Sequence, residues 1–592
     1  MRGDSGARYD ARVKSNIAQA VAGLLLLSLV SLAIHGTRPA RERNFVYDDI
    51  LVIRDSDFIT HPGNLLHLFD RKYLRDSGEQ TYRPVVTATY ILDYQLWGLS
   101  PRGFTFTNLA IQVLAAWFLG LVLLQALPGR RLVAASSALL YLLHPALIET
   151  ATVPSNREQI LSVLFILLSG WTWLHRPRRL RWLSPLFLLL GCYTLEWCAL
   201  WPAVLFAWAY VESGSWKKAL RSAAPEIVVG GVYVLLMFSV FAGSPGAPDR
   251  IRTGLGTGLW AFGTIFWQYV KTALAPSDLR PSYVFAWPSF KLSLAGQFAL
   301  WAALIAVFVS LLRRRRWAVG GLIFFLGLLP VSHIFFPFWI PLADRYLALP
   351  LVGFIPLLCA LFFARKWYWG VPAVLIVASF WFAQSSAEAR VWRNNNVLWH
   401  ETTMRSSGDP VGWTNYGAAL LAVGDNARAV AAHRIAWRLT RRLGAEAPAQ
   451  ASNYVTALIA VGQEKQACWV IEKQIYRFHA DRGVLLLTGR ACAGPDPQAA
   501  YAALSAILVD NPRDCEAWAA LCPLYRAEIP ACLRRAMNHC PDDPILWAQV
   551  AQVHAAVGDE DKCERAITMA LSKADTRQRA RIAGAMPRCR RR

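Results

Sequence analysis

Two adjacent carboxylates, Asp48 and Asp49, follow the first apolar segment of this 592-residue chain. Neighbouring carboxylates repel each other, and a position close to a bilayer desolvates them further, so at least one pKa should be raised. One of the two can then take a proton from a hydroxyl while the other orients that hydroxyl. The pair predicts a general base, although an Asp here also suits a helix N-cap or a turn.

Further ionisable residues lie near the ends of later apolar segments. They are His144, Glu149, Arg157, Glu196, Asp344 and Arg345. Ionisable groups at membrane depth are costly, so they indicate function or an internal ion pair. The guanidinium of Arg157 or Arg345 can bind a phosphate through two parallel hydrogen bonds. The structural alternatives are the pairs Glu149–Arg157 and Asp344–Arg345.

Asp55-Ser56-Asp57 matches the acid-x-acid pattern that holds a divalent cation against a nucleotide-sugar diphosphate. Three residues match such a pattern often by chance, and no α/β nucleotide-binding pattern surrounds them. We therefore expect no metal site.

The elements that position these groups are helices. Hydrophobic residues make up 55% of the chain, and before about residue 385 they form runs long enough to cross a bilayer. We predict an all-α fold with about eleven crossings, at 17–34, 105–126, 132–150, 158–174, 180–192, 195–211, 226–242, 291–312, 317–331, 345–363 and 367–385. Residues 259–275 carry Gln268 and Lys271 among aromatics, which favours a helix at the membrane surface.

Basic residues in alternate short loops orient this bundle. The net charge is +23, and much of the basic charge falls in short loops between apolar runs, for example Arg130-Arg131 and Arg313 to Arg316. This pattern is typical of cytoplasmic loops, so we do not expect nucleic acid to be a partner. With these loops in the cytoplasm, the loop 35–104 and the C-terminal half lie outside.

The C-terminal half is polar and weakly repetitive. Units near Trp413 and Tyr454, and those near Trp518 and Trp547, are spaced by roughly 30–40 residues, which resembles tetratricopeptide spacing. We predict a membrane domain over 1–387 and a helical repeat domain over 388–592 that binds a polypeptide, with an unrelated helical bundle as the alternative.

Cysteines are distributed unevenly between the halves. Eight of the eleven follow residue 460, without zinc-type spacing, which favours disulfides in an oxidising compartment. Cys589, in a basic tail, is expected to be unpaired.

Several stretches in this order resemble the transmembrane and tetratricopeptide-repeat-containing O-mannosyltransferases, of the GT-C class of glycosyltransferases. They are Phe45 to Asp49, Tyr82 to Asn108, His144 to Arg157, Pro330 to Pro350, Trp392 to Trp399 and Asn415-Tyr416-Gly417. The stretch from Tyr82 to Asn108 matches in both residue choice and spacing.

The resemblance implies an inverting enzyme that moves one sugar, mannose or another hexose, from a polyprenyl phosphate to Ser/Thr hydroxyls. Asp48 or Asp49 would be the base, and Arg157 and Arg345, with Arg83, would bind the leaving lipid phosphate. A monophosphate carrier needs less charge neutralisation than a diphosphate, so no obligatory cofactor or metal is expected.

Three other functions are open. The enzyme could glycosylate a lipid or an envelope glycan, the chain could be a non-catalytic membrane-anchored repeat scaffold, or it could be a transporter. The absence of an N-x-Ser/Thr sequon and of a retrieval tail favours a bacterial inner membrane with periplasmic repeats over the endoplasmic reticulum.

Overall fold

The computed structural model describes most of the chain, and every regular element in the described part is a helix, which confirms the predicted all-α class. The described residues are 3–36, 43–70, 73, 77, 81–175, 178–241, 255–281, 283, 294–332, 334, 342–365, 367–442, 448–474, 481–574, 576–585 and 589. Two compact units follow each other, Met1–Arg405 and Ser406–Arg592. The first unit extends past the predicted boundary at 387 by including α16 (Asn395–Arg405).

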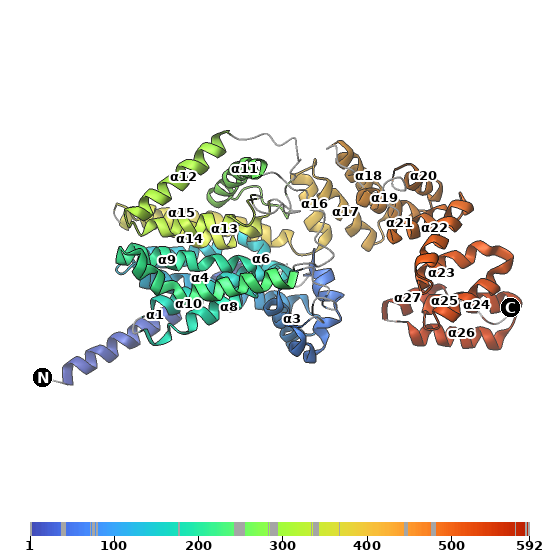
Figure 1. Ribbon diagram of the computed structural model, residues 1–592, viewed down its shortest axis with the longest axis horizontal. Coiled ribbons are helices and arrows are strands. Elements are labelled where there is room, and N and C mark those ends of the chain that lie inside the picture. Colours follow the sequence, from blue (N-terminus) through green and yellow to red (C-terminus); the bar gives the residue numbers. More distant parts are fainter. Residues whose placement is uncertain are drawn as a thin grey trace. The chain divides into compact units, whose positions relative to one another are not determined.

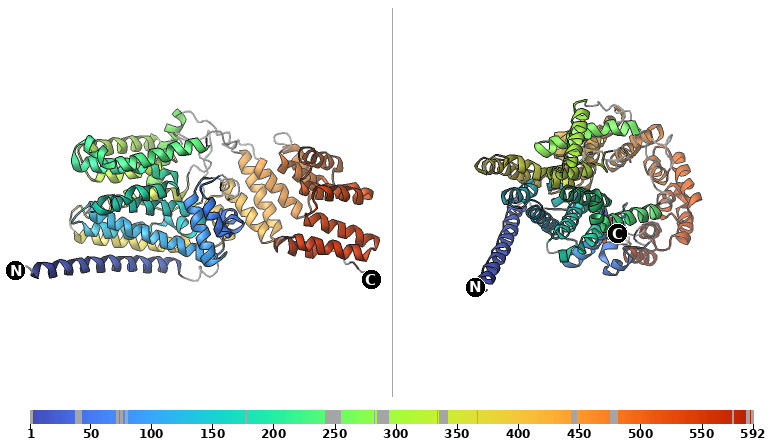
Figure 2. Two further views of the ribbon diagram at one scale, coloured as in Figure 1. Left: turned by 60° about the horizontal axis from the view of Figure 1, so that its bottom comes forward. Right: turned by 60° about the vertical axis from the view of Figure 1, so that its left-hand side comes forward.

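The first unit is a bundle of helices that lie side by side (Figures 1 and 2). Its main helices are α1 (Gly3–His35), α3 (Pro84–Trp97), α4 (Pro101–Ala126), α5 (Arg131–Leu143), α7 (Arg157–Leu174), α8 (Leu183–Cys192), α9 (Trp201–Ser213), α10 (Trp216–Phe241), α11 (Leu255–Leu274), α12 (Leu294–Leu312), α13 (Trp317–Leu328), α14 (Ala348–Phe362) and α15 (Trp367–Val391). Helix α4 packs on α5 and α7, and α13 packs on α14.

Six helical stretches in the described part are long and apolar enough to cross a membrane. They are Ala18–His35, Pro101–Ala126, Trp216–Met237, Leu294–Leu312, Asp344–Phe362 and Trp367–Val391. The bent pair Arg131–Leu143 and Pro145–Thr152 adds a seventh if it forms one span. The first unit is therefore a multi-pass membrane domain.

The other predicted spans also lie on helices, namely α7, α8, α9 and α13. None of these helices alone is both long enough and apolar enough to cross a membrane. The count of eleven therefore stays a prediction. Residues 242 and 291–293, at the edges of two predicted spans, lie outside the described residues. The predicted surface helix corresponds to α11, which is not among the six, and it buries Phe262, Ile265 and Phe266 along one face.

Short helices connect the longer ones, and two of those that precede α3 pack against it. Those before α3 are η2 (Ile50–Arg54), η3 (Phe58–Thr60) and η4 (Pro62–His67), and those between α5 and α7 are η5 (Pro145–Leu147), α6 (Ile148–Thr152) and η6 (Pro154–Asn156). The last two are η8 (Glu196–Leu200), before α9, and η9 (Asp344–Leu347), before α14. Proline is tolerated in a first helical turn but not in a helix interior, so Pro145 and Pro154 divide the chain between α5 and α7 into short turns. This segment carries the predicted site residues His144 and Glu149.

The second unit is a row of paired helices. They are α17 (Pro410–Ala422), α18 (Asn426–Arg442), α19 (Pro448–Ala460), α20 (Glu464–Gln474), α21 (Arg482–Cys492), α22 (Pro497–Asp510), α23 (Cys515–Leu521), η10 (Cys522–Glu528), α24 (Ile529–His539), α25 (Pro544–Val557), α26 (Glu560–Lys573) and α27 (Thr576–Ala585). Each odd-numbered helix from α17 to α25 also contacts the next odd-numbered helix, as in a stacked solenoid. This arrangement is consistent with the predicted repeats.

Three repeats start with the same local geometry. The indole N–H of Trp413, Trp518 and Trp547 donates to the carbonyl oxygen six residues earlier, at 2.8, 2.9 and 2.8 Å. In each case an Asp four residues before the Trp caps the helix through its side chain. This recurrence is the physical basis of the weak sequence repeat.

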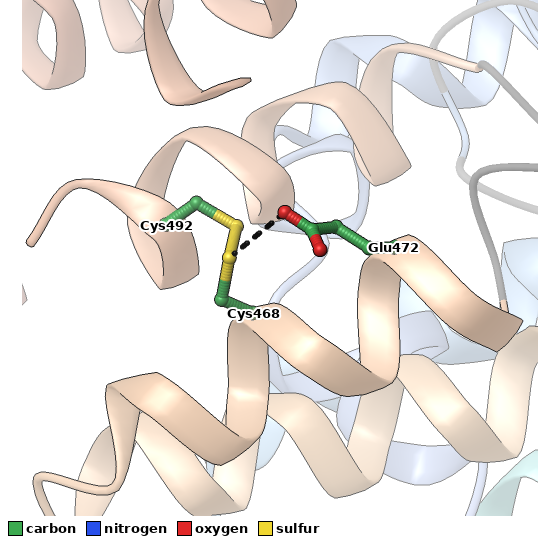
Figure 3. Close-up of side chains that lie close together, drawn as sticks. All are labelled: Cys468, Glu472 and Cys492. Carbon is green, nitrogen blue, oxygen red and sulfur yellow. Dashed lines mark hydrogen bonds between the residues drawn. A yellow bond between two sulfur atoms is a disulfide. The ribbon is translucent and has the colours of Figure 1, made fainter. Parts of the chain in front are cut away.

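All eight cysteines of the second unit form disulfides, as expected for an oxidising compartment. The pairs are Cys468–Cys492, Cys515–Cys540, Cys522–Cys532 and Cys563–Cys589. The expectation that Cys589 is unpaired is wrong, because it is joined to Cys563 of α26. Glu472 lies 3.5 Å from the sulfur of Cys468 (Figure 3), but oxidised cysteines are not metal ligands, so this trio is a disulfide beside an acid.

Candidate active site

The two adjacent acids have different surroundings. Asp49 is fully buried, and its carboxylate accepts hydrogen bonds from the backbone N–H groups of Val46 (3.1 Å) and Ser155 (2.7 Å). Asp48 is exposed, and its carboxylate takes part in none of the hydrogen bonds found among the described residues. Asp49 therefore ties the loop 45–49 to the turn before α7, and Asp48 is the acid that a substrate can reach.

The electrostatic surroundings of the two acids differ in the same way. Burial raises the pKa of Asp49 to about 7, and the hydrogen bonds from Ser155 and Val46 oppose this shift. Surrounding protein also desolvates Asp48 and raises its pKa, while the positive charge of Arg345 lowers it. Arg345 thus favours the deprotonated Asp48 that a general base requires.

Tyr47 places Asp48 through an unusual backbone conformation. Its φ of 54° lies in the left-handed region, which for a residue other than Gly costs about 1–3 kcal/mol and needs support from surrounding structure. The N–H of Tyr47 donates to Oδ1 of Asn395 in α16 (2.9 Å), and its ring contacts Trp399, with centroids 5.6 Å apart. The guanidinium carbon of Arg345 lies 5.9 Å from the ring centroid.

Arg345 and Glu149 form a buried ion pair beside Asp48. Nη1 of Arg345 lies 2.7 Å from Oε1 of Glu149, and the two side chains are only 8% and 2% exposed. Asn156 donates to the same oxygen (3.0 Å). The second oxygen of Glu149 is buried and has no hydrogen-bond partner among the described residues. The structure therefore pairs Arg345 with Glu149 and not with its neighbour Asp344.

Arg83 and Glu158 form a second ion pair in the same cluster. Nη1 of Arg83 lies 3.3 Å from Oε1 of Glu158, and the charges of Arg345 and Asp48 also act on Glu158. The other oxygen of Glu158 is buried and unpartnered among the described residues. The cluster thus joins Asp48, Arg83, Glu149, Glu158 and Arg345 at one end of the bundle.

Arg157 does not belong to this reactive cluster, although the sequence predicts a phosphate contact. It is fully buried and uses four of its five N–H groups, toward Asn108 (2.6 Å), Thr89 (2.9 Å), Asp93 (2.5 Å) and the carbonyl of Phe104 (3.1 Å). A guanidinium bound in this way cannot also bind a lipid phosphate. Arg157 is instead the internal link between α3, α4 and α7, and its ion-pair partner is Asp93 and not Glu149.

The stretch from Tyr82 to Asn108, which resembles the family most specifically, also helps to hold α3, α4 and α7 together. Thr107 donates to Asp93 (2.7 Å), and Asn108 donates to the carbonyls of Thr150 (3.0 Å) and Val153 (3.2 Å). At Gly103 a Cβ atom would lie only 2.3 Å from the ring of Trp97, so α4 can approach α3 only with glycine here. The stretch Gly103 to Asn108 is therefore a folding motif.

His144 is also structural. It is fully buried, its Nδ1 accepts from the N–H of Ala146 (3.2 Å), and its Nε2 lies 3.2 Å from the carbonyl of Ala273. Because Nδ1 accepts, the proton is on Nε2 and donates to Ala273. Both nitrogens are used at the bend between α5 and η5, so the predicted substrate contact is not supported.

Neither Asp344 nor Glu196 forms a hydrogen bond or ion pair with the residues of the cluster in the described part of the chain. Asp344 accepts from the N–H of Arg280 and the hydroxyl of Tyr283, both at 2.7 Å, and so fixes the chain before η9. Glu196 begins η8 and is exposed, with no ion pair among the described residues.

The site residues that the sequence prediction omitted are Glu158, Asn156 and Tyr47. Glu158 directly follows Arg157. An ionisable residue at the start of a predicted span was the signal in the sequence that could have identified it. Nothing in the sequence shows the left-handed backbone at Tyr47, because it depends on the distant Asn395.

The acid-x-acid pattern Asp55-Ser56-Asp57 does not form a metal site within the described residues. Asp55 forms a bidentate ion pair with its neighbour Arg54, at 2.8 and 2.9 Å, and Asp57 precedes η3. Within the described residues, no group of acids or histidines converges around this loop.

Comparisons with known proteins find similarity to proteins named as protein O-mannosyl-transferases. No protein-family model matches the chain. The chain is 24% identical over 362 residues to the protein O-mannosyl-transferase F38B6.6 of Caenorhabditis elegans, an alignment that covers 57% of this chain and 51% of that protein. It is 31% identical over 130 residues to the protein O-mannosyl-transferase Tmtc1 of Drosophila melanogaster, covering 21% of this chain and 15% of that protein.

These relatives confirm the family resemblance seen in the motifs. The matched region spans about half the length of the worm protein and less of the fly protein. What the comparisons support is a glycosyltransferase similar to protein O-mannosyltransferases.

Proposed function

We propose that the protein transfers one hexose, mannose by its relatives' names, from a polyprenyl phosphate to Ser or Thr hydroxyls of exported polypeptides. The observation that carries this proposal is Asp48, an exposed carboxylate next to the buried pair Arg345–Glu149 at one end of a membrane bundle. An exposed acid beside a buried cation suits a water-soluble acceptor and a lipid-anchored donor.

Asp48 is the base in this proposal. It takes the proton of the acceptor hydroxyl as the hydroxyl oxygen bonds to the anomeric carbon. The bond from that carbon to the phosphate oxygen breaks on the opposite face, so the configuration inverts and the polyprenyl monophosphate leaves with the electron pair. Asp49 positions Asp48 by tying its loop to Ser155.

Arg345 and Arg83 receive the charge that develops on the leaving phosphate. Each is paired with a buried acid, Glu149 or Glu158, which holds the guanidinium in place and keeps the site near neutrality without the donor. Each acid also retains one buried oxygen without a described donor, which fits acceptance from sugar hydroxyls. We propose that this charge stabilisation needs no obligatory metal or cofactor, because the leaving group is a monophosphate.

The same reasoning gives the location and the partner. The reaction end carries the loop 35–104, which the basic loops assign to the outside, so we place the reaction on the periplasmic face of a bacterial inner membrane. The helix pairs of the second unit bind the acceptor polypeptide or a partner protein, as stacked helical repeats commonly do.

The test is intact-mass and glycopeptide analysis of exported proteins from cells that carry the full-length protein or its variants. Asp48→Asn should lower hexose transfer by about 10²–10⁴-fold at unchanged protein level. Asp57→Asn, an exposed acid in the same loop, should retain transfer. Full transfer by folded Asp48→Asn protein would exclude this mechanism, and unchanged proteins with altered envelope glycans would assign a glycan acceptor instead.

A further inference from the structure

A second feature of the membrane domain lies away from the acidic cluster. A cavity of about 460 Å³ opens between α4, α7, α9, α13 and α14. Its volume falls within the roughly 300–1,000 Å³ of typical ligand sites. Apolar side chains provide most of its lining, including Leu123, Leu174 and Leu357. Such a lining fits a hydrocarbon chain.

Basic residues stand at one end of this cavity. Arg130 and Arg316 both belong to the lining and both are exposed. Nη1 of Arg316 donates to the carbonyl of Ala126 (3.2 Å), which joins the two loops that carry these arginines. The guanidinium of Arg316 has further N–H groups that can bind an anion. Helices α5 and α13 also begin here, at Arg131 and Trp317, and helix N-termini attract negative charge.

Two tryptophans in the lining carry polar groups that lack a partner. The indole nitrogens of Trp201 and Trp208 are buried, and neither has a hydrogen-bond acceptor among the described residues. Trp201 is only 6% exposed. The two residues are seven apart on α9, so they lie on one face of that helix. Buried N–H groups are rarely left unsatisfied, so each calls for an acceptor, which an oxygen atom of a ligand supplies once the indole ring turns toward the cavity.

We propose that this cavity binds an anionic phospholipid from the leaflet opposite the reaction site. Arg130 and Arg316 bind its phosphate, the indole N–H groups of Trp208 and Trp201 face its oxygen atoms, and an acyl chain fills the apolar interior. Basic pockets between membrane helices on the cytoplasmic side recognise anionic headgroups in this way.

The geometry argues against the sugar carrier as the occupant. Helix α7 starts at Arg157, next to the acidic cluster, whereas its contribution to the cavity runs from Leu167 to Leu174. At 1.5 Å per residue, the cavity starts about 15 Å from the cluster and reaches about 25 Å from it. A carrier phosphate held by Arg130 and Arg316 would therefore be far from Asp48.

The test is native mass spectrometry of the full-length protein in detergent, titrated with phosphatidylglycerol or phosphatidylcholine of equal chain length. We expect phosphatidylglycerol to bind at least tenfold more tightly. Arg130→Gln with Arg316→Gln should remove that preference. The matched control is Arg131→Gln with Arg315→Gln, because these residues come from the same two loops but do not line the cavity.

Two further variants keep the test decisive if the double variant folds poorly. Arg130→Gln alone removes an exposed charge and should weaken phosphatidylglycerol binding severalfold. Trp201→Phe removes one indole N–H but keeps an aromatic ring, and it should weaken binding of both lipids.

Three outcomes would overturn the proposal. The first is equal loss of binding in the control double variant, which would mean a general attraction to positive loops. The second is equal affinity for the two phospholipids. The third is displacement of phosphatidylglycerol by an equimolar polyprenyl phosphate, which would assign the cavity to the carrier.

Discussion

Two buried arginines near the same end of the membrane domain have opposite surroundings. Arg157 is enclosed by Asp93, Thr89, Asn108 and the carbonyl of Phe104, and none of its side-chain surface is exposed. Arg345 has one strong partner, Glu149, and lies over Tyr47 beside the exposed Asp48. The first guanidinium is satisfied by the protein, whereas the second retains N–H groups for a ligand.

The two arginines show how a structural charge can be distinguished from a functional one. Burial alone does not, because both arginines are buried. The number of satisfied hydrogen-bonding groups does, because a complete network stabilises a fold and an incomplete one leaves groups for a substrate.

The largest expected effect is on the closed network, which consists of Arg157 and its partners Asp93, Thr89, Asn108 and Phe104. Arg157→Met should destabilise the membrane domain by about 3–5 kcal/mol, because it leaves the buried Asp93 carboxylate without its cation. Thermal unfolding and folded yield in detergent measure this loss. Arg345→Lys is the matched variant, because it keeps a cation beside the buried Glu149, and it should lower sugar transfer far more than folded yield. If Arg157→Met folds normally and loses only transfer, the structural assignment of Arg157 is wrong.

The pH dependence of stability should reveal the burial of Asp49. The carboxyl of Asp49 has a pKa of about 7 in the folded protein against 3.8 for an ordinary Asp. The folded state therefore holds this proton more tightly, and the stabilisation is complete below pH about 4 and is lost as the pH rises to about 7. Over that range the change should be on the order of 3 kcal/mol.

Asp49→Asn removes this titration, so its stability should vary less between pH 4 and 7 than that of the unchanged protein. Thermal unfolding of both proteins across this range is the measurement, and Asp57→Asn is the control. Parallel curves for Asp49→Asn and the unchanged protein would show that Asp49 is not desolvated.

Much of the architecture was predictable because long apolar runs and helix pairs are local signals. The helical class, the membrane domain and the disulfides of the second unit follow from hydropathy, spacing and cysteine placement. The pairing of Cys589 with Cys563 was missed, because a cysteine in a basic tail carries no local sign of its partner.

The site was predictable only in part, because contacts between distant residues decide it. The sequence places Asp48, Glu149 and Arg345 at the membrane boundary, and the structure brings them together. It also suggests Arg157 and His144, whose partners Asp93 and Ala273 are far away in the chain. Residue type and position cannot show whether a buried cation is already satisfied.

The open cluster consists of Asp48, Arg83, Glu149, Glu158 and Arg345. Its chemistry should depend on the planar guanidinium of Arg345. Arg345→Lys keeps the charge but not the paired N–H groups that fit a phosphate. We expect transfer to fall by roughly 10–100-fold, about 1.4–2.7 kcal/mol of transition-state stabilisation. Initial rates with a purified polyprenyl-phosphate sugar and an acceptor peptide measure this fall. Unchanged rates would mean that the phosphate binds elsewhere.

The smallest effects compare one hydrogen bond from each cluster. Thr107→Val removes the donor to Asp93 in the closed network and should lower stability by about 1 kcal/mol without changing transfer. Asn156→Leu removes the donor to Glu149 in the open cluster and should weaken transfer severalfold, because Glu149 then holds Arg345 less firmly. Thermal unfolding and transfer rates on both variants give a crossed comparison. The distinction between the clusters fails if the two variants change stability and transfer in the same proportion.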